Sequence, residues 1–141
     1  NKLFENKYPV FAVLQLCSVQ ISDNIIKNVQ KSGICIRGAK RAVINSNEID
    51  TVGDCGISIS DSTNCVLMKN TIKNSHFAAI EAYNETSVNI SNNEVVNCGD
   101  YGIMVYTGAD VTASKNKFVD MSKSFVFLST KGHHIMRCNA A

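Results

Sequence analysis

The sequence of 141 residues contains no tryptophan, only one proline and few aromatic residues, and its formal net charge is +2. A charge so close to neutral gives no electrostatic basis for binding a nucleic acid or an acidic membrane surface. No apolar run approaches the roughly 20 residues that a membrane-spanning helix needs. No secretory signal is visible at the start of the chain. We therefore expect neither a nucleic acid nor a membrane as partner.

What the sequence does contain is a repeat of 23 residues. Asparagine recurs in one register at Asn1, Asn24, Asn47, Asn70, Asn93, Asn116 and Asn139. With Asn counted as position 1, positions 3, 11, 13, 19 and 21 are mostly apolar; position 3, for example, is Leu3, Ile26, Ile49, Ile72, Val95 and Phe118. Positions 11 and 13, and positions 19 and 21, alternate with polar neighbours, which is the period of a strand. Each repeat therefore predicts three short strands separated by bends.

One repeat alone can bury little apolar surface. Coils stacked at the strand spacing of about 4.8 Å place like residues over like, and the columns become a continuous core. We predict an all-β parallel β-helix that forms a single domain over residues 1–141, with about six coils at 1–23, 24–46, 47–69, 70–92, 93–115 and 116–138. The sequence begins and ends at the same phase of the repeat without a polar cap, so we expect a fragment of a longer protein.

The asparagines lie between two predicted strands, where the chain must turn. Asparagine tolerates the left-handed backbone conformation better than most residues. Its amide both donates and accepts hydrogen bonds, so identical residues can bond up and down a stack. We predict an internal asparagine ladder of Asn24, Asn47, Asn70, Asn93 and Asn116. The alternative is that asparagine only marks surface turns.

The leucine-rich repeat is the nearest alternative fold, because its LxLxxNxL core matches Val88, Ile90, Asn93 and Val95. The chain has five Leu against fourteen Ile, and isoleucine favours strands over helices. The segments GISISDSTNCVLMKNTIKN and GIMVYTGADVTASKNKFVD instead resemble the right-handed, single-stranded parallel β-helix family. That family includes pectate lyases, polygalacturonases, carbohydrate-binding and sugar-hydrolase domains, and scaffolds such as F-box proteins with β-helix domains. The resemblance covers nearly the whole chain, but it is specific for fold rather than activity.

The six cysteines occupy six different positions of the repeat, so none is expected to stack on another. Cysteines whose Cα atoms are more than about 7 Å apart cannot form a disulfide. We therefore expect free thiols and a reducing, cytoplasmic compartment. Two glycosylation triplets, Asn84-Glu85-Thr86 and Asn89-Ile90-Ser91, favour secretion as the alternative. Such triplets also arise by chance in a chain rich in Asn, Ser and Thr.

In the family that the chain resembles, ligands lie along the outer face of the strand that here carries positions 10–14, and on its flanking turns. The resemblance implies that candidate ligand-binding residues lie on this face: Arg37, Asp61, Glu81, Tyr83 and Tyr106. A stack of Tyr83 on Tyr106 beside these charges suits a sugar or a peptide. The alternative is a solvated strand face whose tyrosines pair across coils.

Catalysis has little support in this sequence. Acid–base cleavage of a glycosidic bond needs two carboxylates about 5–9.5 Å apart on one face. The only candidate for a second carboxylate beside Glu81 is that of Asp61, which lies one coil below and three positions further along the repeat. The aspartate pair of polygalacturonases and the calcium-binding carboxylates of pectate lyases have no counterpart, so we predict no catalytic residue, metal or cofactor.

These observations lead to three functional hypotheses. The first is a non-catalytic recognition scaffold that binds a protein or peptide along the outer strand face. The second is a carbohydrate-binding or polysaccharide-active β-helix whose catalytic residues lie outside this segment. The third is a structural stack that associates with itself end to end.

Overall fold

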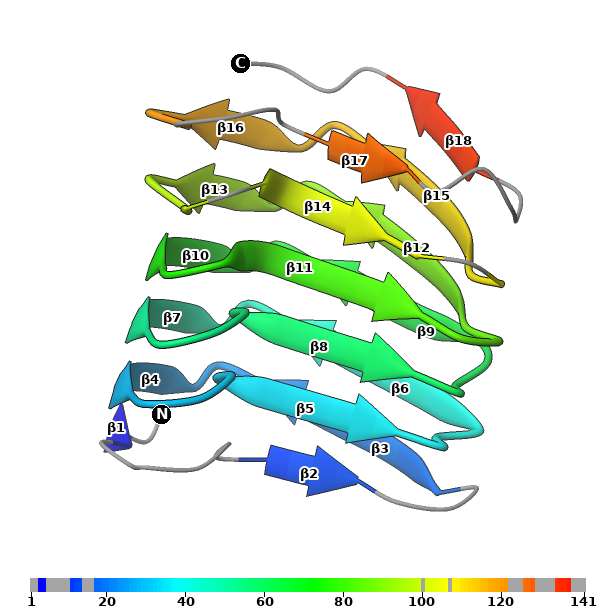
Figure 1. Ribbon diagram of the computed structural model, residues 1–141. Helices are drawn as coiled ribbons and strands as arrows, with labels where there is room; N and C mark the ends of the chain where they lie inside the picture. The colour runs from blue at the N-terminus through cyan, green and yellow to red at the C-terminus, as the bar shows by residue number, and fades with distance from the viewer. Residues whose placement is uncertain are drawn as a thin grey trace.

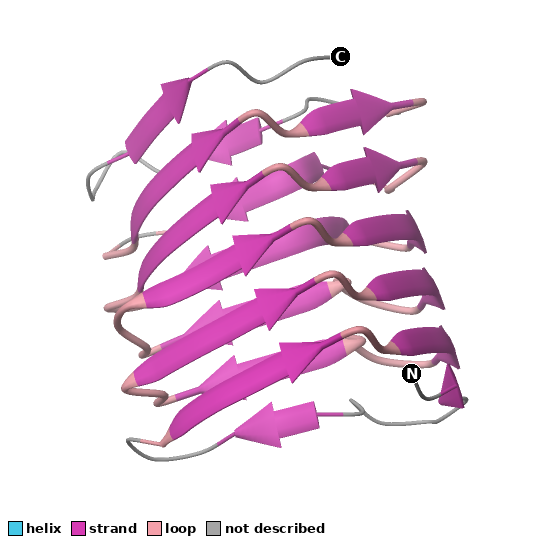
Figure 2. Ribbon diagram, turned by 180° about the vertical axis from the view of Figure 1, so that it is seen from behind, coloured by secondary structure: helices cyan, strands magenta, loops and turns pink. Residues whose placement is uncertain are grey.

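The structure is a computed structural model that describes residues 3–4, 11–13, 17–99, 101–106, 108–121, 126–128 and 134–137. Side chains are described for residues 17–99, 101–106, 108–121 and 126. Within these ranges the chain winds through three parallel sheets of six strands each (Figure 1). Seen from behind, the coils rise in a regular stack from the N-terminal to the C-terminal end (Figure 2).

Every described coil contributes one strand to each sheet. Sheet A contains, in spatial order, β1 (Leu3–Phe4), β4 (Ile25–Val29), β7 (Glu48–Val52), β10 (Thr71–Ser75), β13 (Glu94–Val96) and β16 (Lys117–Val119). Sheet B contains β2 (Phe11–Val13), β5 (Ile34–Arg37), β8 (Ile57–Ser60), β11 (Ala78–Tyr83), β14 (Tyr101–Val105) and β17 (Val126–Leu128). Sheet C contains β3 (Ser18–Ser22), β6 (Arg41–Asn45), β9 (Cys65–Met68), β12 (Ser87–Ser91), β15 (Asp110–Ser114) and β18 (His134–Arg137).

The all-β parallel solenoid with three strands per coil is therefore confirmed. About four turns of 23 residues are regular, fewer than the six coils predicted. The first and last predicted coils account for the difference, because much of each lies outside the described residues. The asparagines predicted at positions 1 and 139 also lie outside them.

The register stacks like residues on like. Ile49 pairs with Ile72 in sheet A, and Ile57 pairs with Ile80 in sheet B. The first coil is the exception, because Phe4, not Leu3, pairs with Ile26. The predicted stacking of Leu3 on Ile26 is thus wrong by one residue. Phe11 follows Phe4 by seven residues, whereas their partners Ile34 and Ile26 are eight apart, and this difference of one shifts the register of β1.

The five predicted inward columns form the core. From the second coil to the fifth, every member of these columns is exposed by 4% or less: Ile26, Ile49, Ile72, Val95; Ile34, Ile57, Ile80, Ile103; Ile36, Ile59, Ala82, Val105; Ala42, Cys65, Val88, Val111; and Ile44, Leu67, Ile90, Ala113. Each full turn thus buries five side chains that a lone repeat would leave in water. Burial of this apolar surface is the main force that holds the coils together.

Sheet A carries a sixth buried column that the alternating pattern did not predict. Its members are exposed by 3% or less: Val29, Val52, Ser75 and Cys98. Each follows a residue in the left-handed conformation, with φ between 51° and 59°: Asn28, Thr51, Asn74 and Asn97. The left-handed residue interrupts the strand period, so position 6 rather than position 5 faces inward after position 3.

The asparagines at position 1 hydrogen bond from coil to coil. Asn70 Oδ1 accepts from the main-chain N–H and from Nδ2 of Asn47, both at 3.0 Å. Asn70 Nδ2 donates to the Ile44 carbonyl and to Asn93 Oδ1, both at 3.0 Å. Asn47 and Asn93 repeat this pattern with their own neighbours. These amides, which are 1–2% exposed at positions 47, 70, 93 and 116, satisfy main-chain groups that the turn leaves unpaired.

The prediction that these asparagines adopt the left-handed conformation is wrong. The left-handed residue at this bend is the one before: Asp23, Ser46, Lys69, Asn92 and Lys115, with φ between 56° and 59°. That residue makes the sharp turn, and the asparagine that follows points its amide into the core. The side chain is therefore selected for hydrogen bonding rather than for backbone tolerance.

Four buried or half-buried cysteines, Cys35, Cys55, Cys65 and Cys98, are free thiols, as predicted. Burial raises the pKa of the Cys65 thiol to about 11. An unfolded cysteine has a pKa of about 8.5, so above that pH the unfolded chain ionises first. The stabilising effect of the neutral buried thiol is therefore complete below about pH 8.5 and is lost as the pH rises through about 11.

We expect Cys65→Val to remove part of this alkaline loss of stability. Valine occupies the same inward column at Val88 and Val111, so the substitution suits the site. From about pH 7.5 to about pH 10, the variant should gain on the order of 1 kcal/mol relative to the original protein. Urea midpoints at both pH values measure the difference. An identical pH dependence in the two proteins would show that ionisation of Cys65 is not linked to unfolding.

Candidate ligand-binding faces

The outer face of sheet B carries four of the five candidate residues, and Asp61 lies on the turn after β8. Three of them form a row along the stack. The Arg37 and Tyr83 side chains are hydrogen bonded to each other, which raises the pKa of the Arg37 guanidinium. Ser60 lies between these two residues in the register and is only 2% exposed. Tyr83 and Arg37 therefore span the intervening coil.

The tyrosine pair extends this row by one coil. The rings of Tyr83 and Tyr106 lie 6.3 Å apart between centroids, with an interplanar angle of 84°. This edge-to-face arrangement is one that aromatic rings prefer. The Tyr106 hydroxyl also contacts Met104 Sδ at 3.8 Å. The pair is half-buried, so each ring keeps an accessible edge or face.

A second apolar cluster lies beside this row and is separate from the core. Its buried members are Cys55, Ala78 and Met104, and the half-buried Phe77, Tyr101 and Tyr106 pack against them. Sequence analysis did not identify this cluster, although one signal was present. Position 9, just before each sheet B strand, reads Ser32, Cys55, Ala78 and Tyr101 and forms a column of its own.

Glu81 lies at the edge of this cluster. Its carboxylate accepts hydrogen bonds from Ser58 Oγ at 3.3 Å and from Cys55 Sγ at 3.1 Å. Burial, followed by the charge of Glu81 and this hydrogen bond, strongly raises the pKa of the Cys55 thiol. The thiol therefore stays protonated and acts as a donor to the carboxylate.

The structure does not join Glu81 to Asp61. Asp61 lies on an exposed bend after β8, where its carboxylate accepts from Asn84 Nδ2 at 3.5 Å. Each carboxylate thus has its own partners on its own coil edge. The five predicted residues divide into the row Arg37–Tyr83–Tyr106, the Glu81 site and the Asp61 bend.

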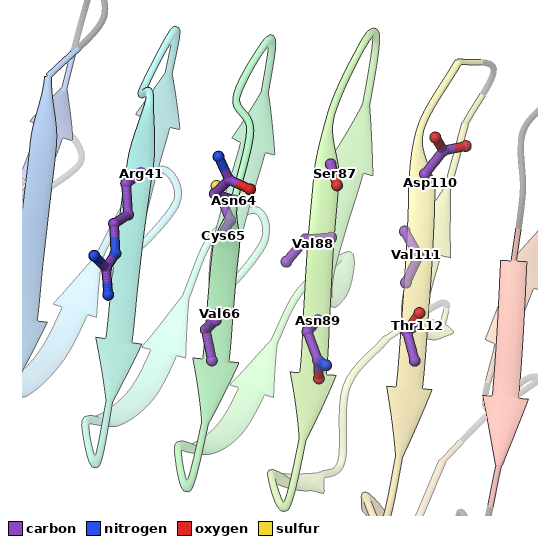
Figure 3. A pocket seen from close by; sticks show the side chains of 10 residues that line it. All are labelled: Arg41, Asn64, Cys65, Val66, Ser87, Val88, Asn89, Asp110, Val111 and Thr112. Carbon is purple, nitrogen blue, oxygen red and sulfur yellow. The ribbon is translucent and has the colours of Figure 1, made fainter.

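A groove on the outer face of sheet C was not predicted. Its volume is about 650 Å³, and it crosses β6, β9, β12 and β15 (Figure 3). The lining residues are Arg41, Asn64, Cys65, Val66, Ser87, Val88, Asn89, Asp110, Val111 and Thr112. In these coils the outward position 18 carries Arg41, Asn64, Ser87 and Asp110, and the outward position 20 carries Val43, Val66, Asn89 and Thr112. None of these residues is aromatic, so no aromatic column marked a binding face here.

A second hollow of about 620 Å³ follows the bend between sheets A and B. Beside it runs an exposed polar row, in which Asn97 Nδ2 donates to Asn74 Oδ1 at 2.8 Å and Asn74 Nδ2 donates to Asp50 Oδ1 at 2.7 Å. These contacts occupy much of the hydrogen-bonding capacity of the row, which suits a structural role.

The described residues contain neither a metal-binding cluster nor a membrane-spanning helix. No three His, Cys, Asp or Glu side chains there are grouped so that they hold a metal ion. The same residues include no helix of the length and hydropathy needed to span a membrane.

Coils of three parallel strands, stacked in register over an internal hydrophobic core, define a parallel β-solenoid. The family model for the right handed beta helix region matches residues 1–118. The chain therefore belongs to the right-handed β-helix family, which confirms the resemblance found in the sequence. Comparisons with curated proteins and with solved structures gave no match.

Proposed function

We propose that the protein is a non-catalytic recognition scaffold that binds a protein or peptide partner through the outer face of sheet B. The observation that supports this most strongly is the composition of that face. Aromatic residues, methionine and arginine are enriched where protein partners make contact. Here Tyr83, Tyr106 and Arg37 lie together on the outer face of the sheet, Tyr106 rests on the buried Met104, and Glu81 lies at the margin.

The arrangement also suits recognition energetically. Half-buried rings that are already packed lose little freedom when a partner covers them. The hydrogen bond of Arg37 to Tyr83 and the edge-to-face contact of Tyr83 with Tyr106 orient all three side chains in advance. A partner that covers the row therefore gains apolar contact with a small ordering cost.

The test begins with a library of random displayed peptides, from which binders of the whole chain are selected. The affinity of the selected peptides is then measured for the original protein and for purified variants. Tyr106→Ala and Arg37→Ala should each weaken the selected peptides by at least about tenfold, which corresponds to about 1.4 kcal/mol. Lys73→Ala, on the outer face of sheet A, is the matched control and should leave affinity unchanged. If all three variants bind like the original protein, the sheet B face is not the binding surface.

A carbohydrate ligand is the second candidate, because the tyrosine row is bordered by Asp61 and Asn84, which offer polar groups at the adjacent bend. A glycan array run beside the peptide selection separates the two. Saccharide binding that Tyr83→Ala abolishes would favour this candidate over a protein partner. End-to-end self-association depends on the terminal coils, in which many side chains lie outside the described residues.

A further inference from the structure

The sheet C groove has a charge pattern that points to a second ligand. Its four polar residues at position 18 lie one per coil, in the order Arg41, Asn64, Ser87 and Asp110 (Figure 3). The register pairs Ser87 with Asp110, and it pairs the residues that directly follow the first three, Ala42 with Cys65 and Cys65 with Val88. Three coil steps of about 4.8 Å separate the first from the last, which gives about 14 Å between the two charged positions.

The two ends of the groove carry opposite charges. Arg41 provides a guanidinium at one end and Asp110 provides a carboxylate at the other, and both residues are exposed. Between them the lining offers amides and hydroxyls from Asn64, Ser87 and Asn89, with no further charge among the lining residues. A polyanion would meet Asp110 with like charge, and a polycation would meet Arg41 in the same way.

The groove continues past Arg41. A smaller hollow of about 310 Å³ over β3 and β6 shares Arg41 and is also lined by Ser18, Gln20 and Val43. The hollowed surface therefore runs along the stack of coils rather than along a single strand. A ligand that fills it must be elongated and must lie across the strands.

We propose that the sheet C groove binds an extended peptide segment that runs along the axis of the β-helix, with an acidic group at Arg41 and a basic group at Asp110. An extended chain advances about 3.3 Å per residue, so about four to five residues span the two charges. The peptide groups between them both donate and accept hydrogen bonds, as the asparagine amides and the serine hydroxyl of the groove do. A neutral saccharide can hydrogen bond to all of these groups but has no charge to pair with Arg41 or Asp110.

The proposal is tested with four pools of short synthetic peptides that share the same randomised central residues. The pools differ only in their ends: lysine and aspartate in either order, two lysines, or two aspartates. Binding to the whole chain is measured by fluorescence anisotropy at low salt. The two mixed-charge pools should contain the tighter binders, by at least about tenfold.

Single charge reversals should then switch the preference. Arg41→Asp makes both ends acidic, so the two-lysine pool should become the tightest. Asp110→Lys makes both ends basic, so the two-aspartate pool should become the tightest. Lys73→Asp, on sheet A, changes the net charge by the same amount as Arg41→Asp and should leave the mixed-charge preference intact. Circular dichroism of each variant shows that the coils are retained.

The outcomes distinguish this site from the sheet B face. Tyr106→Ala should leave the pool preference unchanged, and Arg41→Asp should leave binders of the sheet B face unchanged. If no pool is preferred, or if the preference ignores both charge reversals, the groove does not bind a peptide in this way. Saccharide binding that Asn89→Ala abolishes, without any peptide preference, would overturn the proposal in favour of a sugar.

Discussion

Replacement of Asn70 by alanine is expected to destabilise the protein by about 2–6 kcal/mol. Four hydrogen bonds are lost: those from the main-chain N–H and Nδ2 of Asn47, and those to the Ile44 carbonyl and Asn93 Oδ1. Asn47 Nδ2 keeps the Ile21 carbonyl and Asn93 Oδ1 keeps the main-chain N–H of residue 70, so the Asn47 N–H and the Ile44 carbonyl are the groups that lose a partner without a second one of this kind. A buried polar group left without a hydrogen bond costs about 1–3 kcal/mol. Natural domains are stable by only about 5–15 kcal/mol, so the loss threatens the fold as a whole.

Urea unfolding followed by circular dichroism measures this loss. Asn89→Ala is the matched control, because Asn89 has the same side chain on the exposed outer face of sheet C. The control should change stability by no more than about 0.5 kcal/mol. If the two variants unfold at the same urea concentration, the amide column does not contribute the stability that its hydrogen bonds indicate.

The second large effect is expected at Gly53, where alanine has no room. A Cβ atom there would collide with the main-chain oxygen of Gln30 and lie 2.8 Å from its carbonyl carbon. Both obstacles are backbone atoms, so no side-chain rotation relieves them, and two coils must move apart. The same coils are joined by the hydrogen bond from Gly53 N–H to the Val29 carbonyl at 2.8 Å. We expect Gly53→Ala to cost about 3 kcal/mol, the upper end for overpacking.

Gly108→Ala separates this collision from the general cost of replacing a glycine. Gly108 has φ of +87°, and the nearest atom to an added Cβ is 3.4 Å away. Alanine there costs only the left-handed conformation, about 1–2 kcal/mol. Thermal or urea unfolding should therefore show that Gly53→Ala is less stable than Gly108→Ala. The reverse order would mean that the coils separate easily at Gly53. Gly99 repeats the collision, against His76 two coils further on, and offers an independent site for the same test.

The sequence predicted the three sheets and the core because these follow from two periods. The strand period of two identified Ile34 with Ile36, and Ile57 with Ile59, as inward pairs, and all four are fully buried. The 23-residue repeat then required such pairs to stack, as Ile57 does on Ile80. Both signals are local or strictly repeated, so they needed no knowledge of contacts between unlike residues.

The bends were less predictable. The left-handed residue before each asparagine, Ser46 or Lys69 for example, has no fixed residue type, so no pattern marked it. Main-chain geometry decides which residue adopts the left-handed conformation. The inward column at Val29 and Val52 follows from a similar left-handed bend in sheet A. Alternation alone places neither feature.

The candidate sites were predicted only in part. Position 14 placed Arg37, Tyr83 and Tyr106 on one face, but the span of Arg37 across Ser60 to Tyr83 depends on side-chain length and direction. The sheet C groove was not predicted, because the polar and charged residues in its lining are of ordinary types whose significance lies in their order along the stack.

By itself, then, the sequence determined the coil, its three faces and the residues that face inward, because hydrophobic burial repeats at fixed spacings along the chain. Only the tertiary structure decided which residue makes each sharp turn, which outward side chains meet across coils and where the surface is hollow. These depend on backbone dihedral angles and side-chain directions that differ from coil to coil while the apolar pattern stays the same.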